Sequence, residues 1–100
     1  MGQQETIGKH KTTVSASNGW AIVVYHQTTV VKFNDSQIVL DTGGWYTPTT
    51  KSRMNQTSNQ FDLGFDVYQR NFAFYVYFKG ENYMFGPDNT LTLDRQGAKV

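Results

Sequence analysis

Residues 41–61 read DTGGWYTPTTKSRMNQTSNQF, and this stretch decides the fold because it interrupts a chain otherwise patterned as β-strands and turns. The paired glycines at 43–44 break the preceding strand, since they accept backbone angles that other residues avoid. Thr47 and Pro48 then predict a helix start, with Thr as the N-cap and Pro at the first helical position. We therefore expect one helix of about three turns, ending near residue 60.

The expected helix is polar on most of its surface. Met54 and Phe61 lie seven residues apart, with Thr57 and Ser58 between them, and give one thin apolar stripe. Asn, Ser and Thr are poor helix formers, so tertiary packing has to hold this helix in place. The remaining faces carry Lys51, Arg53, Asn55, Gln56, Asn59 and Gln60.

Four short strands are expected before the helix. Asn18-Gly19 is the strongest short-range signal for a two-residue hairpin turn, so a hairpin opens the fold. The arm that follows this turn is almost wholly apolar, as expected of a central strand covered on both faces. We predict an antiparallel meander whose strands span residues 11–16, 20–25, 28–33 and 37–40.

After the helix, the apolar residues return to a period of two, which predicts strands again. Residues 63–68 alternate as a half-buried strand. In residues 72–78 the phenylalanines share one face, which we expect in the core, while Tyr75 and Tyr77 share the other face. Two shorter strands are expected over residues 83–85 and 90–93.

These elements predict an α+β fold with an antiparallel β-sheet, in which about four strands, one helix and three or four further strands follow one another. A chain of 100 residues is the size of one domain. We expect a leader over residues 1–10, a single domain over residues 11–93 and a tail over residues 94–100.

The composition excludes several chemistries. Without cysteine, the chain has no disulfide, thiolate nucleophile, thiolate zinc site or iron–sulfur cluster. His10 and His26 fall in the leader and in a turn, away from clustered ligands, so we expect no metal and no other cofactor. The net charge of +1 gives no global attraction to nucleic acid. No export signal and no run of about 18 apolar residues is present, so we expect a cytoplasmic protein without a membrane partner.

One short motif suggests catalysis. Residues 40–43 read LDTG, the apolar-Asp-Thr-Gly string of aspartic proteases, and the retroviral members are homodimers in which each chain gives one Asp to a dyad. The later apolar-apolar-Gly string of those proteases has only a poor counterpart at residues 63–64. We favour the alternative, in which Asp41 caps a strand-to-helix turn, because three-residue motifs recur by chance. An enzyme is therefore not expected.

Two features offer a binding surface instead. The first is the helix with Trp45 beside it, because Arg, Lys, Asn and Gln contact polar protein surfaces, phosphates and base edges. The second is the tyrosine face, since exposed tyrosines stack bases or anchor interfaces, unless a second layer covers them. The candidate binding residues are Trp45, Lys51, Arg53, Asn55, Gln56, Asn59, Gln60, Tyr75 and Tyr77.

A longer motif begins in the same stretch. It consists of DTGGW at 41–45, TTK at 49–51, RMNQ at 53–56, NQF at 59–61 and LGF at 63–65. This motif resembles small uncharacterised proteins encoded by bacterial viruses, and the resemblance covers roughly residues 28–78. It implies a phage accessory protein that engages a host or defence component, such as a CRISPR effector. No catalytic residue carries over from it.

We therefore predict a protein that acts by binding, with a host or defence protein as its partner and an anti-CRISPR-like inhibitor as one example. The alternative is a small nucleic-acid-binding protein that uses Lys51, Arg53 and the sheet tyrosines. A dimeric aspartic protease that uses Asp41 is a more remote alternative. The sequence leaves the oligomeric state open between a monomer and a homodimer.

Overall fold

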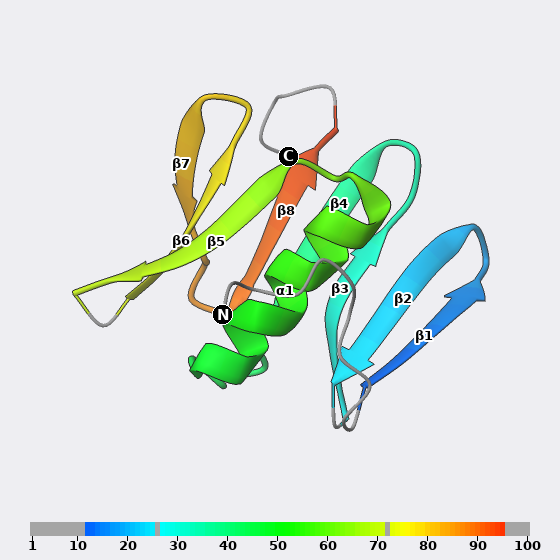
Figure 1. Ribbon diagram of the computed structural model, residues 1–100, viewed down its shortest axis with the longest axis horizontal. Coiled ribbons are helices and arrows are strands. Elements are labelled where there is room, and N and C mark those ends of the chain that lie inside the picture. Colours follow the sequence, from blue (N-terminus) through cyan, green and yellow to red (C-terminus); the bar gives the residue numbers. More distant parts are fainter. Residues whose placement is uncertain (1–11, 26, 72, 96–100) are drawn as a thin grey trace.

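In the computed structural model, which describes residues 12–25, 27–71 and 73–95, the chain forms eight strands and one helix (Figure 1). The expected leader, both histidines, Phe72 and residues 96–100 lie outside the described residues. The predicted α+β fold is confirmed. The elements are β1 (Thr12–Ser17), β2 (Trp20–Tyr25), β3 (Thr28–Phe33), β4 (Gln37–Asp41), α1 (Pro48–Phe61), β5 (Phe65–Arg70), β6 (Ala73–Phe78), β7 (Glu81–Met84) and β8 (Thr90–Asp94).

The larger sheet has five antiparallel strands in the order β1-β2-β3-β4-β8. Asn18 and Gly19 have φ angles of 54° and 83°, as a two-residue hairpin turn between β1 and β2 requires. The predicted meander of the first four strands is confirmed. The last strand is an edge strand, as expected, and it pairs with β4, where Leu91 lies opposite Leu40.

The smaller sheet has three antiparallel strands in the order β5-β6-β7. Val67 lies opposite Val76, and both are buried together with Phe74 and Phe78. The predicted core face of this segment is therefore confirmed. Tyr77 points to the other face and is 47% exposed, so one face of this sheet packs and the other meets solvent.

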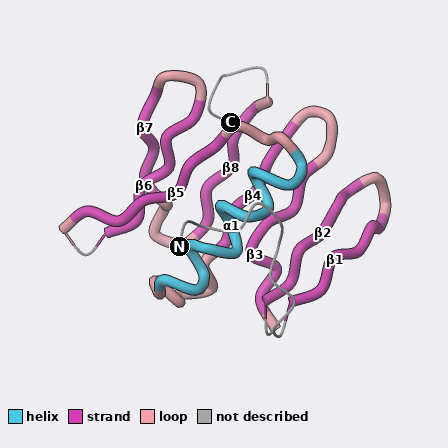
Figure 2. The backbone as a smooth tube through the Cα atoms, in the orientation of Figure 1, coloured by secondary structure: helices cyan, strands magenta, loops and turns pink. Residues whose placement is uncertain are grey.

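Helix α1 begins and ends as the sequence predicts. The Thr50 N–H donates to Thr47 Oγ1 at 3.2 Å, and Pro48 occupies the first turn. At the other end Asp62 adopts the left-handed conformation, with φ of 56°, and donates its N–H to the Ser58 carbonyl. The helix packs against β2, β3 and β5, between the two groups of strands (Figure 2). No helix in the described part of the chain is long and apolar enough to cross a membrane.

The hydrophobic core lies where the helix meets the two sheets. Within α1, Met54 is the one buried apolar side chain, and the five other buried residues are polar. Phe61 packs on Phe33 of β3, with ring centroids 5.1 Å apart. The larger sheet supplies most of the aliphatic core, through Val23, Val30, Val31, Ile38, Leu40, Leu91 and Leu93.

Candidate functional site

The helix side chains predicted to meet a partner divide into a buried and an exposed group. Asn55 and Gln56, which were expected on the faces away from the apolar stripe and among the binding residues, are only 7% and 5% exposed. The helix therefore offers a smaller polar surface than its sequence predicts. The candidates that keep partial or full exposure are Lys51, Arg53, Asn59 and Gln60.

The burial of Asn55 follows from the open edge of β5. This strand pairs with β6 on one side only, so its other edge presents N–H and C=O groups that need partners. Asn55 Nδ2 donates to the Val67 carbonyl at 2.8 Å, and the Val67 N–H donates to Asn55 Oδ1 at 2.7 Å. Ser58 Oγ donates to the Phe65 carbonyl at 2.7 Å and accepts the Phe65 N–H at 3.0 Å. These polar side chains therefore provide hydrogen-bond partners for backbone groups on the open edge of β5.

Arg53 links the helix to the first hairpin. Its Nε donates to Thr12 Oγ1 at 2.8 Å, and its Nη1 donates to Gln56 Oε1 at 3.3 Å. The guanidinium carbon lies 5.3 Å from the centroid of the Tyr25 ring, within the range of a cation–π contact. The Arg53 guanidinium thus already contacts other side chains of the same molecule, which makes it less available to a partner.

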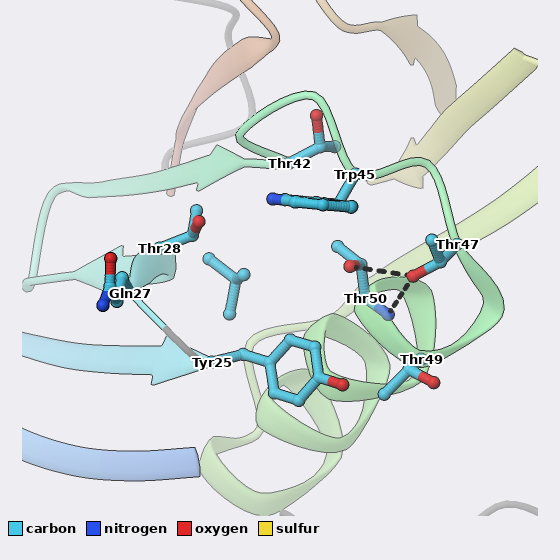
Figure 3. Close-up of a pocket in the computed structure, with 9 residues that line it drawn as sticks. Tyr25, Gln27, Thr28, Thr42, Trp45, Thr47, Thr49 and Thr50 are labelled. Atoms are coloured by element: carbon cyan, nitrogen blue, oxygen red, sulfur yellow. Dashed lines mark hydrogen bonds between the residues drawn. The ribbon is translucent and has the colours of Figure 1, made fainter. Parts of the chain in front are cut away.

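An open cleft of about 890 Å³ lies beside the start of the helix (Figure 3). The indole of Trp45 and the ring of Tyr25 face the hollow from opposite sides, and Trp45 is 64% exposed. Threonine side chains, one amide and one valine complete the wall, and among the described residues that line the cleft there is no carboxylate and no cation. The lining residues are Tyr25, Gln27, Thr28, Val30, Thr42, Trp45, Thr47, Thr49 and Thr50.

Trp45 sits on a tight loop between β4 and α1. The Gly43 N–H donates to Asp41 Oδ1 at 2.8 Å, and the Gly44 N–H donates to Thr42 Oγ1 at 3.1 Å. The Trp45 N–H donates to the Thr42 carbonyl at 2.9 Å, and Thr42 is completely buried. Hydrogen bonds from the backbone N–H groups of the loop to Asp41 and Thr42 therefore position Trp45, while its ring stays largely in solvent.

Gly43 brings this loop against β3. Its φ angle is 61°, a left-handed conformation that glycine adopts without steric cost. A Cβ at Gly43 would lie 2.8 Å from Cγ2 and 2.9 Å from Oγ1 of Thr28, which lines the cleft. The Asp-Thr-Gly string is thus a packed turn, and the Asp41 carboxylate acts as an acceptor within it.

Tyr46, the neighbour of Trp45, anchors the same loop to distant parts of the chain. Its hydroxyl donates to Asn89 Oδ1 at 2.8 Å. Its ring meets Phe74 and Phe85 edge-on, with centroid separations of 5.1 Å and 6.4 Å. The loop that carries Trp45 is therefore held from the side of the smaller sheet as well as from β3.

Comparison with protein families identifies the family of the chain. The family described as Kyanoviridae Gp96 protein matches residues 1–92. The chain belongs to this family. The match supports the phage origin that the longer motif implied, and the protein is a phage accessory protein. That the longer motif is a signature of this family stays a prediction. Comparison with curated proteins and with solved structures gives no match.

The tyrosines predicted as a second surface lie on the outer face of the smaller sheet, and none of them lines the cleft. Tyr68 stacks on Tyr75, with ring centroids 5.6 Å apart, and its hydroxyl donates to Asn82. Tyr75 is half-buried and Tyr77 is exposed. The structure therefore leaves this face partly open and separate from the surface around Trp45.

Sequence reasoning identified Trp45 but missed the residues that face it. Tyr25 ends an apolar strand and Thr28 begins the next one, so the sequence pattern indicated only a place in a strand for each of them. The lining residues come from two stretches of this family member, residues 25–30 and 42–50, and no local spacing relates the two stretches. The one sequence signal that could have indicated the cleft was the group of threonines around the helix start. Their presence was already accounted for by the helix N-cap.

Ionisable groups contribute little to this site. The described residues contain no group of three or more His, Cys, Asp or Glu side chains placed to hold a metal ion. The pKa of Asp88 is lowered, chiefly because the Thr90 hydroxyl donates to its carboxylate at 2.8 Å. Asp88 lies in the turn before β8, outside the cleft. The chemistry of the cleft is thus aromatic and neutral polar.

Proposed function

We propose that this phage accessory protein acts by binding a protein of the host, such as a component of a defence system. We propose further that Trp45 is the central contact. The observation that carries the proposal is the 64% exposure of Trp45 beside a cleft whose described lining residues carry no charge. Tryptophan is among the residues that most often dominate the binding energy of protein interfaces. The adjoining cleft gives a side chain of the partner a place to insert.

The loop that carries Trp45 supports this proposal because contacts within the molecule hold it in place. Hydrogen bonds to Asp41 and Thr42 hold the backbone, and Tyr46 anchors it beside the smaller sheet. A preorganised contact loses little conformational freedom when the partner binds, so more of its contact energy contributes to affinity. The threonine hydroxyls around the cleft suit the polar rim that surrounds such a contact.

A protein partner is favoured over nucleic acid by the distribution of charge. Nucleic-acid sites neutralise several phosphates with Lys and Arg, whereas the described residues that line the cleft include neither. Lys51 and Arg53 lie on the helix, but Arg53 already contacts Thr12 and Tyr25. Binding that weakens steeply with salt would favour the nucleic-acid alternative.

Binding without catalysis is favoured because Asp41 has a structural use. Its carboxylate accepts the Gly43 N–H and so holds the turn that presents Trp45. An aspartic protease needs this carboxylate at a dyad shared with a second chain. We therefore propose that the Asp-Thr-Gly string serves the binding loop, and that the aspartic protease remains the alternative to be tested by mutation of Asp41.

An affinity pull-down from host lysate tests the proposal. Wild-type protein would be compared with Trp45→Ala and with Tyr77→Ala, which removes another exposed aromatic ring outside the cleft. We expect one protein, identified by mass spectrometry, to be retained by wild type and Tyr77→Ala, to survive nuclease treatment, and to be lost with Trp45→Ala. Equal retention by Trp45→Ala, or loss of the protein after nuclease treatment, would contradict the proposal.

A further inference from the structure

We propose that the cleft beside Trp45 receives an uncharged aromatic side chain that carries one polar group, a tyrosine or a tryptophan of the partner protein. This inference rests on the function proposed above and specifies what the partner inserts. Residues that dominate the binding energy tend to pair across an interface, and they are enriched in tryptophan, tyrosine and arginine. The lining of the cleft decides among these three residue types.

Two aromatic rings form facing walls of the cleft. The indole of Trp45 lies on one side of the hollow and the ring of Tyr25 on the other (Figure 3). The cleft of about 890 Å³ is large enough for a ring to enter between them. A ring beside either wall gains an offset or edge-to-face aromatic contact in addition to the apolar area that it buries. The two walls therefore favour an aromatic side chain over an aliphatic one.

The inner wall combines apolar groups with hydroxyls. Val30, Thr42 and Thr50 line this wall, and all three are buried. Thr42 Oγ1 accepts the Gly44 N–H at 3.1 Å, and Thr50 Oγ1 accepts the Thr47 hydroxyl at 3.1 Å. A hydroxyl oxygen can accept two hydrogen bonds, which suits a phenol O–H or an indole N–H. An aliphatic side chain would remove these hydroxyls from water without offering them a hydrogen bond.

Charge argues against an arginine of the partner. The guanidinium carbon of Arg53 lies 5.3 Å from the centroid of the Tyr25 ring, so a second cation on this wall would meet a like charge. The described residues that line the cleft include no carboxylate to neutralise an inserted cation, and no cation to neutralise an inserted carboxylate. Tyrosine and tryptophan are thus the residue types that satisfy both the rings and the neutral lining.

Blocked amino acids test the inference without the partner. The probes are the N-acetyl amides of tyrosine, leucine, arginine and glutamate, each titrated into the isotopically labelled full chain. The readout is the NMR signal of the Trp45 indole N–H. The indole N–H of Trp20, which is not among the residues that line the cleft, is the internal control. Trp45→Ala assigns the two signals, because the chain has two tryptophans.

The tyrosine amide should shift the Trp45 signal with saturation, at a dissociation constant on the order of 1 mM, and leave the Trp20 signal nearly unchanged. We expect the leucine, arginine and glutamate amides to bind at least about threefold more weakly. Equal or tighter binding of any of these three would overturn the proposal. So would the absence of a saturable shift with the tyrosine amide, or equal shifts of both indole signals, which indicate non-specific contact.

Two variants test the reason for the selection against a cation. Arg53→Gln removes the positive charge beside Tyr25, whereas Arg53→Lys keeps a positive charge at this position. The preference for the tyrosine amide over the arginine amide should fall by about half or more in Arg53→Gln and persist in Arg53→Lys. An unchanged preference in Arg53→Gln would overturn the assignment of this selection to Arg53.

The titrations and the pull-down fail in different ways. Retention of the host protein by Trp45→Ala would contradict the proposed function. Loss of the host protein with Trp45→Ala, together with tighter binding of the leucine, arginine or glutamate amide than of the tyrosine amide, would leave the proposed function standing and overturn the present inference.

Discussion

Asn55 of α1 and Val67 of β5 exchange two hydrogen bonds, of 2.8 Å and 2.7 Å, so that a side-chain amide occupies the place of a neighbouring strand. The side-chain amide of asparagine, like a peptide unit, carries an N–H donor and a C=O acceptor in one plane, with a second N–H besides. Ser58 serves Phe65 in the same way, one helical turn further along. The helix thus closes an edge that would otherwise invite pairing with another chain.

Removing this pair of hydrogen bonds should destabilise the protein. Asn55→Ala should lower the free energy of unfolding by about 2–4 kcal/mol, because the buried N–H and C=O of Val67 lose their partners. Asn59→Ala is the matched control, since it makes the same substitution in the same helix at an exposed position. We expect the control to stay within about 0.5 kcal/mol of wild type. Urea unfolding followed by circular dichroism measures the free energy of unfolding of both variants. Equal losses in the two would contradict the role of Asn55 as the hydrogen-bond partner of the β5 edge.

The close approach of Gly43 to Thr28 should limit what the loop tolerates. Gly43→Ala should lower the free energy of unfolding by about 2–4 kcal/mol, because alanine is strained at this positive φ angle and its Cβ meets the Thr28 side chain. Thr28→Ala removes the two atoms that clash. In a double-mutant cycle the two changes should couple by about 1 kcal/mol or more, and strictly additive losses would contradict the contact.

Mutation of Asp41 distinguishes a structural role in the turn from a catalytic role in an aspartic protease. Asp41→Asn should change stability by less than about 0.5 kcal/mol, because the amide oxygen still accepts the Gly43 N–H, whereas Asp41→Ala should cost about 1 kcal/mol. Thermal unfolding of the two variants measures this difference. Pepstatin-sensitive peptide cleavage at mildly acid pH, abolished by Asp41→Asn, would instead establish the protease and contradict a purely binding function.

Thr90→Val should raise the pKa of Asp88 toward its ordinary value of 3.8, because the Thr90 hydroxyl is the largest cause of the lowered pKa. A carboxyl group whose pKa is lower in the folded state stabilises the fold above its unfolded pKa. That contribution is lost as pH falls through the folded value, so it is complete above pH 3.8 and declines only in stronger acid. An NMR titration of the Asp88 carboxyl carbon compares the variant with wild type, and identical titration curves would exclude this role of Thr90.

Signals between neighbouring residues were sufficient to predict the order of the elements. Asn18-Gly19 marks the first hairpin, and Thr47-Pro48 marks the helix start, because each acts through its own backbone. The pairing of β8 with β4 could not be predicted in this way. Both strands have ordinary β patterns, and nothing local in either one specifies its neighbour across the intervening helix and second sheet.

The candidate site could be predicted only in part. Trp45 was identified because it lies beside the start of the polar helix, and the structure places most of its side chain in solvent. Tyr25 and Thr28 join it only after the chain has folded, so their role has no local signal. Asn55 was expected on a face away from the apolar stripe, and its burial against β5 could not be predicted, because a polar side chain suits solvent and an open strand edge equally well.

The affinity of the purified host partner for Trp45→Ala tests the central claim most directly. Isothermal titration calorimetry at low and moderate salt would compare wild type, Trp45→Ala and Tyr77→Ala. We expect Trp45→Ala to weaken binding by about 30-fold or more, Tyr77→Ala by less than about threefold, and moderate salt to have little effect. An unchanged affinity for Trp45→Ala, or an affinity that falls steeply with salt, would contradict binding of a protein through Trp45.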